Sequence, residues 1–155
     1  MKPIALIILF SCGVYLAIGQ QQSGILRCEV ESTAFKITLQ NGTLSDWRPL
    51  GKLDETVVST ITFDFDKKRI FWDTKSRTND PDFKETIEVY DINKLTRDTT
   101  YSDFGFTTII LKCINEKKQI MNYELIEFNL DNCYSLFLVE NSKKFKSKHE
   151  LKIVQ

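Results

Sequence analysis

The chain has 155 residues, with 21 basic and 21 acidic side chains, a single histidine and a formal net charge of zero. Proteins that bind nucleic acid or anionic membranes show a basic face, so this balance of charge predicts no nucleic-acid partner. A domain of this length buries about two-thirds of the surface that its unfolded chain exposes. One hydrophobic core is therefore sufficient, and we expect a single domain.

The first 19 residues, MKPIALIILFSCGVYLAIG, have the layout of a secretory signal peptide. Lys2 precedes an apolar run, and small residues follow at Ala17 and Gly19, the order in which such peptides place their charge, apolar stretch and cleavage site. The run is shorter than the roughly 20 residues that a membrane span needs, so a retained anchor is the less favoured alternative. We expect cleavage at residue 19 and a secreted, extracellular domain of residues 20–155 without a membrane span.

Three cysteines follow the predicted cleavage site: Cys28, Cys113 and Cys133. Thiols of secreted proteins pair in their oxidising compartment, so one disulfide and one leftover thiol are expected. With one histidine and no Cys-x-x-Cys spacing, a zinc site would lack ligands. We expect no metal and no cofactor. The predicted state is a monomer, with a dimer linked through Cys133 as the alternative.

The sequence gives little support for a catalytic function. A serine hydrolase would need a Gly-x-Ser-x-Gly turn, which is absent. A catalytic cysteine would need a histidine partner, and His149 stands in a lysine-rich tail that is predicted to be a solvated face. We therefore predict no catalytic residues and no enzyme. Five carboxylates at alternating or turn positions are expected to be solvated: Asp64, Asp66, Asp73, Glu85 and Glu88.

From Ile25 onward, segments rich in β-branched and aromatic residues recur between turn residues, which is typical of an all-β domain. The clearest is TITFDFDKKRIFWDT at 60–74, where alternating apolar residues lead into a short turn and out again. This pattern predicts a hairpin. The predicted strands lie near 25–31, 34–39, 57–65, 69–74, 84–91, 104–114, 119–129 and 149–154, with loops at 40–56 and 75–83.

Residues 133–146 are ambiguous between strand and helix. Tyr134, Leu138 and Asn141 fall at helical spacing, and Asp131 or Asn132 could cap a helix that begins there. The spacing predicts a short C-terminal helix.

Asn41-Gly42-Thr43 is an N-glycosylation sequon. It follows a predicted strand, and Asn-Gly is typical of a turn, so the acceptor should be exposed in a secreted protein. We expect a glycan on Asn41.

The stretch SDFGFTTIILKC, residues 102–113, runs from a polar turn through an apolar strand to a cysteine. It resembles the second signature of the lipocalin family, with Asp103, Phe104 and Cys113 in register. The family's other two signatures, Gly-x-Trp in the opening strand and an Arg after the following strand, are not matched in this chain.

The resemblance implies a fold and a disulfide. The fold is a single antiparallel β-barrel of about eight strands, with a β-sandwich as the second choice, because β-domains avoid open sheet edges by closing or by packing two sheets. The implied disulfide joins Cys28 to Cys113 and leaves Cys133 unpaired. A Cys113–Cys133 bond is the alternative.

An eight-stranded barrel encloses just enough space for one small ligand. The resemblance thus implies a carrier or scavenger of a small hydrophobic molecule. The alternative is an inhibitor or effector without a cavity, which would bind a protein partner through loops 40–56 and 75–83. The predicted ligand-binding residues are the apolar side chains assigned to inward faces: Phe63, Phe65, Trp72, Ile87, Val89, Tyr123 and Leu125.

Overall fold

The computed structural model describes residues 24–52, 56–78, 80–130, 133–142 and 145–154. The predicted signal peptide lies outside these ranges. Within them, no helix is long and apolar enough to cross a membrane. The elements of this described part are β1 (Ile25–Ile37), β2 (Arg48–Lys52), β3 (Val57–Asp64), β4 (Arg69–Ser76), β5 (Thr86–Asp98), the 3-10 helix η1 (Ser102–Phe104), β6 (Phe106–Asn115), β7 (Ile120–Leu130), β8 (Cys133–Asn141) and β9 (Phe145–Ile153).

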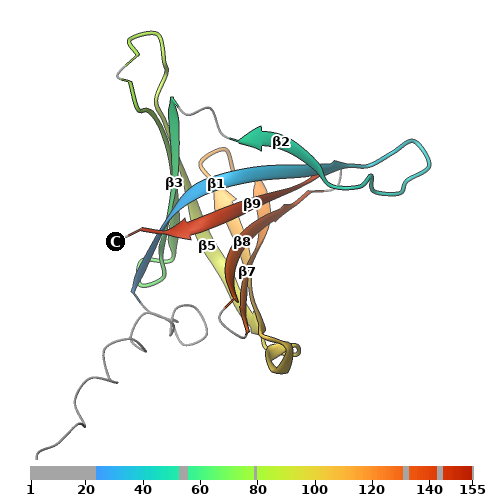
Figure 1. The fold of residues 1–155 in the computed structure, drawn as a ribbon. Helices are drawn as coiled ribbons and strands as arrows, with labels where there is room; N and C mark the ends of the chain where they lie inside the picture. Colours follow the sequence, from blue (N-terminus) through green and yellow to red (C-terminus); the bar gives the residue numbers. More distant parts are fainter. Residues whose placement is uncertain (1–23, 53–55, 79, 131–132, 143–144, 155) are drawn as a thin grey trace, which may run out of the picture.

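Eight of the strands close into an antiparallel barrel (Figure 1). The order around the wall is β1, β3, β4, β5, β6, β7, β8, β9, and β9 pairs back with β1. Closure leaves no open edge among these strands, which is how small β-domains avoid edge-to-edge association. The predicted all-β barrel of about eight strands is confirmed, and the fold is lipocalin-like in architecture.

The ninth strand, β2, lies outside the barrel and shares one edge of β1 with β3. β3 pairs with β1 along Ile25–Glu29, whereas β2 pairs with it along Ser32–Phe35. The opposite edge of β1 is bonded to β9 over Cys28–Ile37. Beyond Glu29, the edge of β1 that paired with β3 therefore pairs with β2.

The predicted hairpin at 60–74 is confirmed as β3 and β4. Ile61 lies opposite Trp72 and Phe63 opposite Ile70. The Asp64 carboxylate accepts the Lys67 backbone N–H at 2.9 Å, as acidic residues that end strands often do. This local pairing directs Ile61, Phe63 and Ile70 into the barrel, where each is at most 1% exposed.

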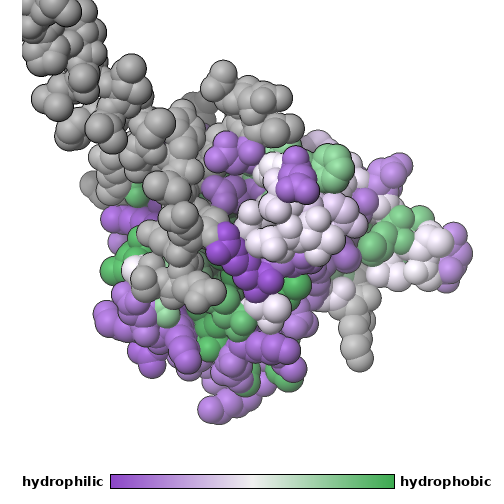
Figure 2. Space-filling model, turned by 90° about the horizontal axis from the view of Figure 1, so that it is seen from below, coloured by the Kyte–Doolittle hydropathy of each residue, from purple (hydrophilic) through white to green (hydrophobic). Residues whose placement is uncertain are grey.

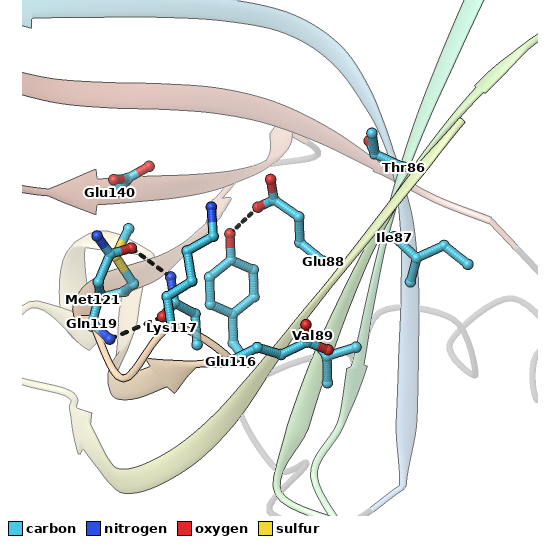
Figure 3. A pocket seen from close by; sticks show the side chains of 11 residues that line it. Thr86, Ile87, Glu88, Val89, Glu116, Lys117, Gln119, Met121 and Glu140 are labelled. Carbon is cyan, nitrogen blue, oxygen red and sulfur yellow. Dashed lines mark hydrogen bonds between the residues drawn. The ribbon is translucent and has the colours of Figure 1, made fainter. Parts of the chain in front are cut away.

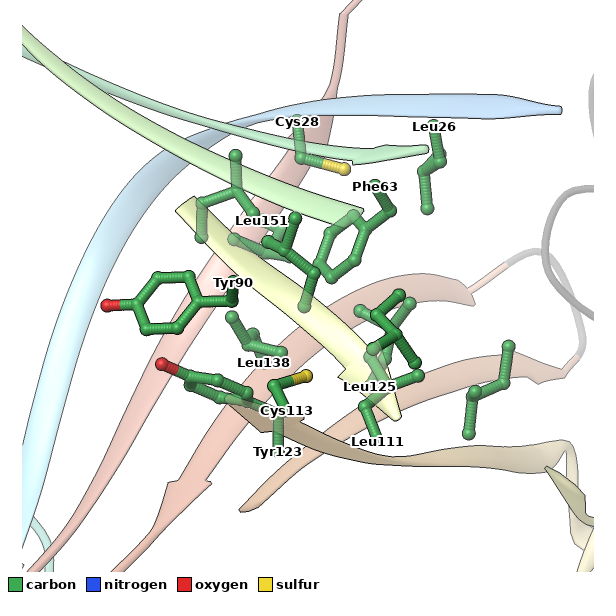
Figure 4. Packing of buried hydrophobic residues seen from close by; sticks show 14 of the residues in the cluster. Leu26, Cys28, Phe63, Tyr90, Leu111, Cys113, Tyr123, Leu125, Leu138 and Leu151 are labelled. Carbon is green, nitrogen blue, oxygen red and sulfur yellow. The ribbon is translucent and has the colours of Figure 1, made fainter. Parts of the chain in front are cut away.

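One end of the barrel is packed with apolar side chains (Figure 4). This closed end carries the first residues of β1 and the 65–68 turn, and the opposite end is the mouth, bounded by the connections at 77–85 and 116–119. Burying each large aliphatic or aromatic side chain stabilises the fold by about 1.5–3 kcal/mol. The buried set includes Leu26, Cys28, Ile61, Phe63, Ile70, Ile92, Leu111, Cys113, Leu125, Leu136, Leu138 and Leu151.

Hydrophilic and hydrophobic residues are interspersed over the visible part of the surface seen from below. There, among the residues that the structure describes, several separate hydrophobic areas lie between hydrophilic ones (Figure 2). Exposed apolar side chains near this end include Ile25, Phe104 and Phe106. Scattered exposure of this kind is normal for a β-domain.

Three sequence predictions about elements are wrong. The described residues of the range 133–146 form β8 (Cys133–Asn141) and the start of β9 at Phe145, not a helix, because Leu136 and Leu138 alternate into the core and β8 pairs on both sides. The predicted loop 40–56 contains β2, and the predicted strands 25–31 and 34–39 are one strand with a bulge between Val30 and Ser32.

The predicted Cys28–Cys113 disulfide is not formed, and neither is the alternative bond from Cys113. Both side chains are free thiols with no exposed surface. Their strands β1 and β6 lie on opposite walls, four steps apart around the barrel in either direction. Neighbouring strands are about 4.8 Å apart, while a disulfide needs Cα atoms within about 7 Å. Cys133 begins β8, and its side chain lies outside the described part.

Candidate ligand site at the barrel mouth

Two adjoining pockets open at the mouth, with volumes of about 500 and about 270 Å³. Both are lined by Thr86, Glu88 and Tyr90 of β5 and by Glu140 of β8, so we treat them as one mouth pocket (Figure 3). Leu50 of β2 also borders it. Thr86 and Glu88 are exposed, so the pocket has access to solvent.

Strand alternation places polar side chains around this pocket. On β9, the inward positions are Leu151 at the core, then His149 and Ser147 toward the mouth. On β5, Ile92 is in the core, and the next inward positions, Tyr90 and Glu88, line the pocket. The barrel interior thus changes from apolar to polar along its axis.

Trp72 of β4 forms part of the pocket wall just above the core. Its indole Nε1 donates a hydrogen bond of 2.7 Å to the Ser59 hydroxyl. Its ring meets the His149 ring edge to face, with centroids 4.9 Å apart at 88°. These contacts hold the indole in one orientation, because buried aromatic rings with a bonded polar atom have few alternative rotamers.

His149 is bonded through both ring nitrogens. Nδ1 lies 3.0 Å from the Thr33 hydroxyl and Nε2 lies 3.1 Å from the Ser147 hydroxyl. Burial lowers the pKa of His149 to about 4, so the ring is neutral at physiological pH, with one nitrogen donating and the other accepting. The sequence analysis placed this residue on a solvated lysine-rich face, and the missed signal was the alternation of Ser147, His149 and Leu151.

Two carboxyl groups face the mouth pocket, and both escaped the sequence analysis as functional residues. Glu88 accepts a hydrogen bond from the Tyr90 hydroxyl. Burial, and then the charge of Glu88, raise the pKa of Glu140. Neither carboxyl forms an ion pair with another residue of the described ranges. Those ranges also contain no group of three or more His, Cys, Asp or Glu residues that could hold a metal ion.

Tyr90 and Tyr123 meet beneath these carboxyls. Their rings pack edge to face with centroids 5.6 Å apart, and their hydroxyls lie near each other (Figure 4). Tyr90 donates to Glu88, and the buried Tyr123 hydroxyl interacts with the Tyr90 hydroxyl. Burial raises the pKa of both phenols, so both are protonated donors at neutral pH.

The predicted ligand-binding residues separate into four groups, of which Ile87 and Val89 are the last. Trp72 lines the mouth pocket. Phe63, Tyr123 and Leu125 are buried in the packed core, where Tyr123 contacts Tyr90 of the pocket wall. Phe65 stacks on Phe63 at the closed end and borders a separate pocket of about 310 Å³.

The predicted inward face of β5 is wrong. Ile87 and Val89 border the mouth pocket from the outer face of the strand, and Ile87 is 65% exposed. Glu88 points to the other side of the strand from Ile87 (Figure 3), and Tyr90, which shares the face of Glu88, is buried. The sequence argument assigned apolar residues to the interior, and this assignment fails where the interior of the barrel is polar.

Comparisons with protein-family models, with curated proteins and with solved structures gave no match for this chain. The interpretation of the site therefore rests on the chemistry of its own residues. That chemistry combines a solvent-accessible pocket, aromatic walls, a neutral buried histidine and two carboxyl groups without ionic partners in the described ranges.

Proposed function

We propose that the protein is a carrier or scavenger that holds one small organic molecule in the mouth pocket without changing it chemically. The observation that carries the proposal is the division of the barrel interior. The closed end is filled by the core, whereas the mouth pocket is open and lined by ordered aromatic and polar groups. Pockets of a few hundred Å³ with a few fixed polar groups are typical of small-molecule sites.

The chemistry of the pocket modifies the expectation of a purely hydrophobic ligand. Trp72 and Met121 provide apolar surface, while Glu140 and Ser147 provide hydrogen-bonding groups. An entirely apolar ligand would leave these polar groups without water or partners, which is unfavourable. A ligand with one apolar and one polar part suits the pocket better.

Binding is favoured over catalysis by the state of His149. Ser147 and His149 are within hydrogen-bonding distance, as a nucleophile and base would be. However, the pKa of about 4 makes His149 a weak base, and its other nitrogen contacts the Thr33 hydroxyl rather than a carboxylate. A serine nucleophile needs a base whose pKa is near the working pH.

Native mass spectrometry of protein recovered from its natural source tests the proposal. We expect one equivalent of a retained small molecule. Thr86→Trp should abolish retention, because Thr86 lines both parts of the pocket. Ile110→Trp is the matched control, since it adds the same side chain at an exposed position of β6 that lines neither part of the pocket, and it should retain the ligand. Absence of any retained molecule, or equal retention by Thr86→Trp, would overturn the proposal.

Secretion and glycosylation are part of the same proposal. Asn41 lies in an exposed turn, and its side-chain oxygen accepts hydrogen bonds from the Thr43 backbone N–H at 3.0 Å and hydroxyl at 2.7 Å. Exposure of the sequon in a turn supports modification of a secreted chain. The resemblance of residues 102–113 to a lipocalin signature supports an extracellular carrier.

A second candidate function is protein binding through the segment at 40–56. Leu44, Trp47 and Leu50 of this segment are 43%, 36% and 66% exposed. Lys36 and Lys148 lie over the Trp47 ring at 5.0 and 5.3 Å from its centroid, which orients the ring on the barrel surface. If this surface binds a partner, Leu50→Asp should abolish partner binding measured by surface plasmon resonance, whereas Thr86→Trp should not.

A further inference from the structure

We infer that the mouth pocket selects a protonated amine carried on an aromatic or similarly flat apolar group. This inference rests on the proposed function of the pocket as a ligand site. Glu88 and Glu140 border the same pocket from β5 and β8, which are three steps apart around the wall. Glu140 is half-buried, whereas Glu88 is exposed at the edge of the pocket, and a cation between them would interact with both carboxylates at once.

Aromatic rings accompany the two carboxylates. Trp72 lies directly opposite Glu88 in the β4–β5 ladder, and Tyr123 lies directly opposite Glu140 in the β7–β8 ladder. Tyr90 contacts Tyr123 between them. Aromatic faces attract ammonium groups and also pack against flat apolar groups, so the same walls suit both parts of such a ligand.

The Tyr123 hydroxyl is a buried polar group next to these carboxylates. Tyr123 is only 2% exposed, its hydroxyl interacts with that of Tyr90, and the charge of Glu140 acts on it. A phenol both donates and accepts hydrogen bonds, so the contact with Tyr90 leaves its oxygen able to accept another. The oxygen can accept a hydrogen bond from an ammonium group placed between Tyr123 and the neighbouring Glu140.

The other titratable groups of the pocket do not replace such a cation. His149 is neutral at physiological pH because of its lowered pKa. The β6–β7 turn contributes Glu116 and Lys117 to the rim, and the Lys117 side chain extends toward the same space in Figure 3. Lys117 forms no ion pair with a described residue. Three carboxyl groups and one ammonium therefore line the pocket, which favours a positively charged ligand.

A metal ion fits the pocket less well than an organic cation. Although Glu88, Glu116 and Glu140 line the pocket, the described ranges contain no group of three or more such side chains that could hold one metal ion, and calcium or magnesium requires about six oxygen ligands. The two carboxylates also lie among aromatic rings, which offer a metal ion nothing but offer an ammonium group favourable contacts.

Isothermal titration with three phenyl probes of similar size tests the inference. The probes are 2-phenylethylamine, the neutral 2-phenylethanol and the anionic 3-phenylpropanoate. We expect the amine to bind at least about tenfold more tightly than the alcohol, as charge-assisted contacts are stronger than neutral ones, and the carboxylate not to bind. Equal affinity of amine and alcohol would overturn the inference, whatever the absolute affinity.

Variants test whether the two carboxyl groups cause the preference for the amine over the alcohol. Glu88→Gln and Glu140→Gln should each weaken amine binding about tenfold while leaving alcohol binding unchanged. Glu85→Gln is the matched control, because Glu85 is exposed in the loop before β5 and does not line the pocket. Circular dichroism melting of each variant checks that the barrel is folded. Unchanged amine affinity in both Glu88→Gln and Glu140→Gln would overturn the inference.

The same measurements separate this inference from the proposed function. If the mouth pocket retains a neutral molecule in native mass spectrometry and Thr86→Trp removes it, the result supports the carrier function and contradicts the selectivity for amines. If no molecule is retained and none of the three probes binds, both fall together.

Discussion

Trp72 and Glu88 lie directly opposite each other on the inner face of the β4–β5 ladder. An indole and a carboxylate are therefore neighbours at the level where the apolar core ends and the mouth pocket begins. Cross-strand neighbours on one face have Cβ atoms about 5 Å apart. This pair links the stability of the barrel to the chemistry of the pocket, and it determines what changes at either residue should do.

Replacing Trp72 by Ala should lower the free energy of unfolding by about 3 kcal/mol, because a large aromatic side chain is removed from the edge of the core. The Ser59 hydroxyl also loses its hydrogen bond from Nε1. Urea denaturation followed by circular dichroism measures the loss. Trp72→Phe is the control, which keeps an aromatic ring but not the donor, and should cost less. A loss below about 0.5 kcal/mol for Trp72→Ala would mean that the side chain is effectively on the surface.

Stability should depend on the protonation of His149. Its folded-state pKa is about 4, below the ordinary value of 6.5, so the unfolded state binds the proton more readily. The stabilisation is complete above pH 6.5 and is lost as the pH falls from 6.5 toward 4, by up to about 3 kcal/mol. His149→Gln should remove this part of the pH dependence. Urea denaturation at pH 7 and pH 5 compares the two proteins, and identical pH dependence in both would contradict the assignment.

Cys28 and Cys113 should remain reduced in the native protein. Burial raises the pKa of both thiols to about 12, and the reactive thiolate is scarce for such groups. We expect neither to react with a thiol reagent until the protein is unfolded, when both should react. Non-reducing peptide mapping provides the independent check. A linked peptide pair containing Cys28 and Cys113 would show that the two walls of the barrel approach each other more closely than described.

Secreted material should begin near Gln20 and carry a glycan on Asn41. The side chain is exposed in a turn, with its oxygen bonded to Thr43. Thr43→Ala should abolish the glycan because it removes the sequon, and Thr43→Ser should preserve it. Peptide mapping by mass spectrometry reports both features. Intact residues 1–19 in the secreted chain, or unmodified Asn41 throughout, would contradict the respective part.

The strand content and the β3–β4 hairpin were predictable because they depend on neighbouring residues. Ile61, Phe63 and Ile70 alternate with polar residues on either side of a turn, and period-two alternation is a local property of a strand. The resemblance of residues 102–113 to a lipocalin signature predicted a closed barrel, and the pairing of β1 with β9 confirms the closure. The number of strands and their antiparallel order followed from these signals.

Long-range pairing decided the remaining features. The sequence pattern of residues 133–146 is compatible with both a helix and a strand, and β8 forms because it is hydrogen-bonded to both β7 and β9. The distance between Cys28 and Cys113 depends on how many strands separate them around the wall, which no spacing in the sequence contains.

The inward direction of Glu88, and with it the polar pocket, depends on register and on depth within the barrel. A shift of one residue exchanges the faces of a strand, and only closure of the eight-stranded wall determines which face encloses the pocket and which meets solvent. The sequence by itself therefore determined the kind of fold, because alternation and turns are local. Only the tertiary structure decided what the barrel could bind, because the pocket is assembled from strands that are distant in the chain.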